Sequence, residues 1–154
     1  MFALDPTDIK ILNLLQEDAR MDVVHIAGRV YKSPSATHER IRKLKEKGVI
    51  KSCIAVLDRT LVGRPTLMIT LVKLNCHAAQ VLRDFPAFMY TYPEVQVCLH
   101  LSGEFDFLLQ VNLRDAEEYE TFLDQKLCNL PMVDKVQSSL VLKECKMMVA
   151  IPLT

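Results

Sequence analysis

The chain has 154 residues, half of them hydrophobic, which is enough apolar material for one large domain or two small ones. Lys and Arg together number 19, as do Asp and Glu, so the formal net charge is zero. That balance hides an asymmetry, since 12 basic and 8 acidic residues precede Pro65, against 7 and 11 from Pro65 onward. A basic half followed by an acidic half suggests a polyanion partner for the first half.

Several classes of protein are disfavoured by what the sequence lacks. No uninterrupted apolar stretch approaches the roughly 18 residues of a membrane helix, and the N-terminus has no charged start followed by an apolar core. We therefore expect a cytoplasmic protein without membrane contact. A glycine-rich phosphate loop, a G-x-S-x-G motif and an H-E-x-x-H motif are all missing, so we expect no enzyme activity and no cofactor.

The cysteines and histidines give no sign of a metal site. The five cysteines are scattered along the chain, odd in number and without a C-x-x-C pair. We expect reduced thiols that pack as small hydrophobic residues. The four histidines are isolated in sequence, although His100 and Asp106 could meet across a hairpin. We expect no bound metal.

Two helices are predicted at the N-terminus. Asp5 and Pro6 form a helix start, because Asp accepts from the first free amides and Pro fits the first turn. Leucines and isoleucines then repeat at helical spacing until about residues 18–20. Asp22 can cap a second, short helix over residues 23–30.

A third helix is predicted over residues 33–47. Ser33 is its N-cap with Pro at the first helical position, and Gly48 ends it because glycine tolerates the left-handed conformation. We expect Ala36, Ile41 and Leu44 to face inward, with polar and basic side chains at the other positions.

The third helix suggests a nucleic-acid interface. Seven basic residues and two acidic ones lie between Tyr31 and Lys51. A solvated surface helix can carry similar charge. A short helix, a tight turn and a basic helix, however, form a helix-turn-helix, whose second helix enters the major groove by its N-terminal end. Its first turns would contact bases and its later residues phosphates. The predicted DNA-binding residues are Ser33, Ser35, Thr37, His38, Arg40, Arg42, Lys43 and Lys45.

The second half of the chain has a βαββαβ pattern. Residues 49–57 are β-rich and can form a wing or a linking strand. Beyond Pro65, strands are predicted over residues 66–74, 95–101, 105–113 and 133–142, with helices over 78–89 and from Asp115 onward. Pro86 should interrupt or end the first of these helices. The order predicts a ferredoxin-like sandwich, and the fold class is therefore α+β.

The predicted strands are apolar on both faces. Two helices can cover only one face of the four-stranded sheet, and an exposed apolar sheet face usually marks an interface. We therefore expect a homodimer with packed sheets, which would present two recognition helices to two half-sites of DNA.

Both halves together resemble the Lrp/AsnC family of regulators. The first half carries the resemblance through the segments 4–12, Ile26-Ala27, 33–44 and Gly48-Val49-Ile50. The second half carries it through the hairpin 101–106 and through 133–138. There are departures: Ile26 and Thr37 replace the usual Leu and Val, and Tyr31-Lys32 replaces the small-apolar pair often found in the turn.

The resemblance implies a sequence-specific DNA-binding transcription regulator. It implies a winged-type helix-turn-helix over residues 1–50, a linker over 51–64 and a ligand-sensing, oligomerising domain over 65–154. An amino acid or related effector would bind between dimers that assemble further, for example into octamers. The effector-binding residues carried over by position are Gly103, Phe105, Asp106, Val136 and Ser138.

Two alternatives share this architecture. One is an enzyme resembling the sirohaem decarboxylases, which keep a vestigial helix-turn-helix. The other is an amino-acid sensor that does not bind DNA. The basic third helix favours the regulator, because a helix that no longer contacts DNA has no reason to keep its exposed Lys and Arg side chains.

Overall fold

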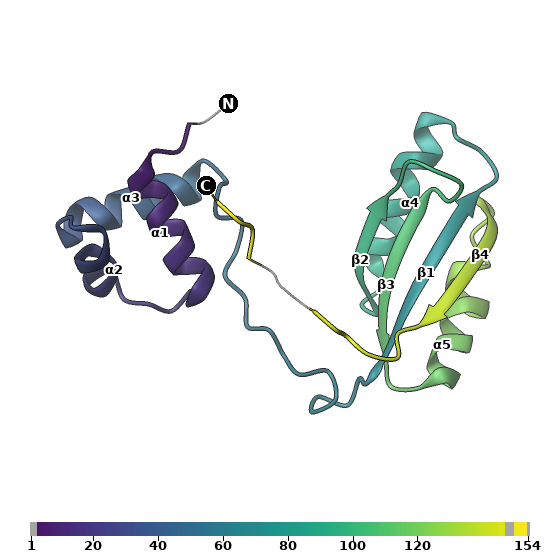
Figure 1. Cartoon of the computed structure of the whole chain (residues 1–154). Helices are drawn as coiled ribbons and strands as arrows, with labels where there is room; N and C mark the ends of the chain where they lie inside the picture. Colours follow the sequence, from purple (N-terminus) through teal and green to yellow (C-terminus); the bar gives the residue numbers. More distant parts are fainter. Residues whose placement is uncertain (1–2, 147–149, 154) are drawn as a thin grey trace. The chain divides into compact units, whose positions relative to one another are not determined.

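The computed structural model describes residues 3–146 and 150–153 of the chain. These residues form two compact units (Figure 1). The first contains the chain up to Ala55 together with the described residues from Cys145 onward, and the second spans Val56–Glu144. No helix in the described ranges is both long enough and apolar enough to cross a membrane.

The first unit is built from the three predicted helices, α1 (Pro6–Glu17), α2 (Val23–Val30) and α3 (Pro34–Glu46). Each begins at a capping side chain. Asp5 accepts from the amides of Thr7 and Asp8, both at 2.8 Å, and the Asp8 carboxylate accepts from the Asp5 amide. The core of this unit contains Ile11, Leu12, Leu14, Ile26, Val30, Ile41 and Leu44.

The buried stripe of α3 differs from the prediction at one position. Thr37, Ile41 and Leu44 are buried, whereas Ala36 is exposed. Thr37, four and seven residues before the other two, lies on the same helical face, and Ala36 is turned about 100° away from it. The prediction that Ala36 faces inward was therefore wrong.

The second unit has the predicted βαββαβ order. Its strands are β1 (Thr66–Leu74), β2 (Val95–His100), β3 (Phe107–Leu113) and β4 (Val133–Leu140). They form one antiparallel sheet in the order β2-β3-β1-β4 (Figure 1). The helices are α4 (Ala79–Thr91) and α5 (Ala116–Phe122), which continues as a π-helical turn over Leu123–Leu127. The predicted ferredoxin-like fold and α+β class are confirmed.

One face of the sheet packs against both helices. Val72 and Leu109 from the strands share a core with Phe85 of α4 and Phe122 of α5, and all four side chains are 0–1% exposed. Phe85 and Phe107 have ring centroids 4.6 Å apart. The opposite face, which carries Leu71, is only partly buried within the single chain.

Helix α4 continues past Pro86, so the prediction that this proline interrupts or ends it was wrong. Proline removes one backbone donor from a helix interior, which normally breaks the helix. Here Phe85 and Met89, on either side of Pro86, are 0% and 1% exposed in the core. Their burial stabilises both halves of the helix against the sheet.

The expectation that the cysteines pack in the core was also wrong for most of them. Cys98 is half-buried on β2, and burial raises the pKa of its thiol to about 11. The other four are exposed: Cys53, Cys76, Cys128 and Cys145. Within the described chain no disulfide joins them.

The chain crosses between the two units twice. The β-rich residues 49–57 form no strand, because the single chain provides no second strand beside them. We predicted that residues 65–154 form the second domain, but the described residues from Cys145 onward belong to the first unit. The Gln16 amide donates to the Ile151 carbonyl at 3.0 Å and accepts from its N–H at 2.6 Å, and Leu153 contacts the core of that unit.

We predict that Gln16→Ala lowers the stability of the first unit. It removes both hydrogen bonds to Ile151, each of which contributes about 1 kcal/mol or less at an exposed position. Urea unfolding followed by circular dichroism should show a loss of about 1 kcal/mol. Lys10→Ala, on the exposed side of the same helix, is the control. Equal stability for both variants would show that Gln16 does not hold the C-terminal segment.

Candidate functional site

Six of the eight predicted DNA-binding residues are exposed on or at the start of α3: Ser33, Ser35, His38, Arg42, Lys43 and Lys45. Ser33 is the N-cap, and its Oγ accepts from the Ala36 amide at 3.2 Å. The same Oγ lies 3.2 Å from the Ser35 Oγ. The beginning of α3 therefore presents two neighbouring hydroxyl groups to solvent, followed by exposed basic side chains.

Thr37 is the clear exception, and the prediction that it contacts DNA was wrong. Its side chain is 0% exposed because it lies on the stripe that packs α3 against α1 and α2. Its Oγ1 has no hydrogen-bond partner among the described residues. Thr37 therefore supports the position of α3 without reaching a base.

Arg40 joins α3 to the start of α1. Its Nη1 lies 2.6 Å from a carboxylate oxygen of Asp5 and 2.8 Å from one of Asp8. The Asp8 amide is the main reason that the pKa of Asp5 is lowered, and the hydrogen bond from Arg40 lowers it further. These contacts pair the guanidinium, which is only partly buried, with the cap of α1, so we interpret Arg40 as a structural residue.

Arg42 is exposed but not electrostatically isolated. Its guanidinium donates two hydrogen bonds to Glu39, at 2.9 and 2.7 Å, and also contacts Glu46. The hydrogen bond from Arg42 is the main cause of the lowered pKa of Glu39. Lys43 lies 3.8 Å from the same carboxylate. Sequence analysis missed these pairs, although three- and four-residue spacing on a helix is the signal for them.

We predict that Thr37→Val stabilises the first unit and leaves DNA affinity unchanged. Valine has nearly the shape of threonine and removes a buried hydroxyl that lacks a partner, which should add about 1 kcal/mol to the free energy of unfolding. Thermal unfolding and duplex binding should be measured on the same preparation. Weaker DNA binding by a stably folded Thr37→Val would restore a direct role for the hydroxyl.

In the second unit, Asp106 is the predicted effector residue with the most structured surroundings. It is 8% exposed, and its Oδ2 accepts from the Leu74 amide at 2.7 Å. Its Oδ1 lies 2.8 Å from Nε2 of His77. The suggested partner His100 instead stacks on Phe107, with ring centroids 4.8 Å apart. Asp106 thus ties the hairpin to the end of β1, and His77 is a partner that the sequence did not reveal.

The other predicted effector residues are divided between two places. Gly103 is exposed in the hairpin, where the neighbouring Phe105 ring lies 5.2 Å from the Lys135 Nζ. Val136 packs against the helix-covered core. Ser138, two residues further along β4, bonds through Oγ to the Tyr119 hydroxyl of α5. In the single chain, Val136 therefore contributes to the core and Ser138 is bonded to α5.

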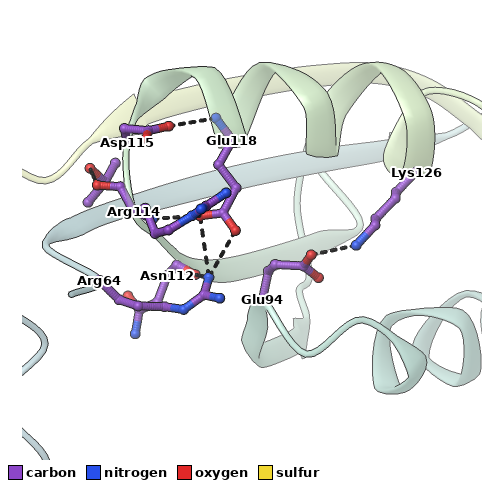
Figure 2. A network of polar contacts seen from close by, with 8 residues as sticks. Arg64, Glu94, Asn112, Arg114, Asp115, Glu118 and Lys126 are labelled. Carbon is purple, nitrogen blue, oxygen red and sulfur yellow. Dashed lines mark hydrogen bonds and ion pairs between the residues drawn. The ribbon is translucent and has the colours of Figure 1, made fainter. Parts of the chain in front are cut away.

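The second unit also forms a hollow of about 430 Å³ beside α5. None of the five predicted effector residues lines it. Two of its acidic side chains form ion pairs, which Figure 2 shows: Glu94 with Lys126, which also lines the hollow, and Glu118 with Arg64, which lies outside it. The Glu118 and Arg64 side chains are 3.2 Å apart. The Arg114 amide donates to Glu118 at 2.6 Å and is the main cause of the lowered pKa of that carboxyl. The contacts of Glu118 attach α5 to the segments before β1 and after β3, and the Glu94–Lys126 pair attaches the following π-helical turn to the start of β2.

Comparison with known proteins identifies both units. Residues 4–51 match the family model of a winged helix-turn-helix DNA-binding domain, and residues 67–151 match that of the Lrp/AsnC ligand binding domain. The leucine-responsive regulatory protein of Haemophilus influenzae is 35% identical over 94% of this chain and 87% of its own length. The transcriptional regulator Zrp of Zymomonas mobilis is 37% identical over 85% and 86%.

Solved structures give the same result. A transcriptional regulator from Neisseria meningitidis, in complex with L-Met, matches with a TM-score of 0.90 and 35% identity over 97% of both chains. The chain is thus a DNA-binding transcription regulator with a separate ligand-binding domain. It belongs to the Lrp/AsnC family.

Proposed function

We propose that this regulator contacts operator DNA through the exposed face of α3, acting in the cytoplasm as a homodimer that assembles further. Ser33, Ser35 and His38 would contact base edges, because they lie at the end of the helix that enters the major groove. Arg42, Lys43 and Lys45 would contact phosphates. The observation that carries the proposal is the exposure of these six side chains on a capped helix.

Glu39 and Glu46 moderate this interface. They neutralise part of the positive charge of Arg42 in the free protein, so a phosphate must compete with two carboxylates for that guanidinium. Like charges oppose the approach of DNA to these carboxylates. The net attraction of α3 for the backbone is therefore smaller than its count of basic residues suggests.

We predict that Arg42→Ala weakens binding to every duplex, whatever its sequence. It removes one phosphate contact and leaves Glu39 and Glu46 without their Arg42 partner near the DNA, so affinity should fall about tenfold and the salt slope should decrease by about one. Glu46→Gln should have the opposite effect on affinity. Fluorescence anisotropy with labelled duplexes at several salt concentrations measures both quantities. Unchanged affinity and salt slope for Arg42→Ala would exclude the phosphate contact.

The uncovered face of the sheet is the surface we propose for dimer formation. Ile69, Leu71, Leu99 and Leu108 lie on this face, as the strand register shows. Leu99 is 50% exposed in the single chain. Packing two such faces together removes apolar surface from water and gives the two-fold symmetry that two half-sites of DNA require.

An amino acid is the effector class we propose. The support is the match to a ligand-binding domain and the L-Met complex of the similar regulator from Neisseria meningitidis. The hairpin residues Gly103, Phe105 and Asp106 would contact the effector, with Val136 and Ser138 nearby once subunits assemble. Asp106 is the candidate for binding an ammonium group, since it is the one acidic residue among these five and its carboxylate would carry the opposite charge.

We predict that Asp106→Asn abolishes the amino-acid response and preserves folding and DNA binding. Asparagine can still accept from the Leu74 amide but lacks the charge that an ammonium group requires. The readout is the rise in melting temperature with about 10 mM L-methionine, then with a pool of the other amino acids. Glu104→Gln removes a charge from the same hairpin and is the control. A retained response in Asp106→Asn would place the effector elsewhere.

A further inference from the structure

Tyr31 has an unusual backbone conformation between α2 and α3. Its φ and ψ are 55° and 47°, and it is the one non-glycine residue with positive φ in residues 3–146 and 150–153. The Lys32 amide donates to the Ala27 carbonyl at 3.0 Å, and the Tyr31 amide to Gly28 at 3.4 Å. These two hydrogen bonds form the motif that commonly ends a helix, with Tyr31 at the position where glycine is favoured.

A tyrosine at this position costs folding free energy. The Cβ of an L-residue meets steric resistance in the left-handed region, whereas glycine does not. Packing does not compensate for this cost, because the Tyr31 side chain is 87% exposed. Glycine would satisfy the same two backbone hydrogen bonds with less strain. Strained residues of this kind concentrate at functional sites, where the side chain serves a purpose other than stability.

The surroundings of Tyr31 indicate what that purpose is. It stands two residues before Ser33, the N-cap of α3, and α3 approaches DNA by this end. Arg29 and Lys32 on either side are exposed and basic. This charge suits a polyanion, and a tyrosine hydroxyl is one of the side-chain donors that proteins use for DNA phosphates.

We infer that Tyr31 is a DNA-contacting residue that positions α3 in the groove. Its hydroxyl donates a hydrogen bond to a backbone phosphate at the edge of the major groove, and its ring packs against the adjoining deoxyribose. The contact is independent of base sequence. This inference rests on the proposed role of α3 as the DNA-contacting helix.

The test compares stability and DNA affinity in the same variants. A labelled duplex of random sequence is a suitable probe, because a phosphate contact requires no operator. Tyr31→Gly should raise the melting temperature by about 4 °C as the strain is relieved, yet weaken duplex binding about tenfold. Tyr31→Phe keeps the ring and the strain, so its melting temperature should stay unchanged and its affinity should fall about threefold.

Tyr90→Ala is the matched control, since Tyr90 is also a surface tyrosine, 93% exposed, but lies on α4 of the other unit. It should leave duplex affinity unchanged. A Tyr31→Gly variant that is more stable and binds as tightly as the parent would overturn the DNA contact. A Tyr31→Gly variant that is not stabilised would overturn the strain argument. If the unaltered protein fails to bind the duplex at low salt, the proposed role of α3 fails, which is a separate result.

Discussion

The position of α3 relative to α1 is the constraint on which the DNA-binding surface depends. Two interactions set it. Burial of Thr37, Ile41 and Leu44 determines which face of α3 is exposed to solvent. The ion pairs of Arg40 with Asp5 and Asp8 hold α3 against the start of α1. A residue of α3 is therefore available to DNA only if it lies off the stripe and is not engaged by the α1 cap.

Local signals explain why so much of the fold could be predicted from sequence. Capping residues such as Asp5 and Ser33 act within one turn, and alternating or helical hydrophobic periods identify the elements of both units. Pro86 shows the limit of local rules: a proline normally breaks a helix, but burial of Phe85 and Met89 outweighs that tendency. The energy that decides such cases comes from residues distant in sequence.

The candidate sites show the same division. The exposed basic residues of α3 follow from composition and helical spacing, and the pairing of Arg42 with Glu39 and Glu46 was within reach of the same reasoning. The contact between Asp106 and His77 could not be predicted in this way, because the two residues are 29 positions apart and are brought together only by the fold of the second unit. The prediction that Thr37 contacts DNA was wrong for a simpler reason. A shift of one residue in the predicted stripe exchanges a buried side chain for an exposed one.

The N-terminal unit also carries features that do not maximise stability or charge attraction. Thr37 buries an unpartnered hydroxyl, Tyr31 occupies a left-handed position, and two carboxylates neutralise part of the charge of Arg42. The first two have different consequences, because Thr37 faces the core while Tyr31 faces solvent beside the start of α3. Only a side chain exposed to solvent can contact DNA, so only there can binding free energy offset the loss of folding stability. Exposure therefore separates a packing imperfection at Thr37 from a functional compromise at Tyr31.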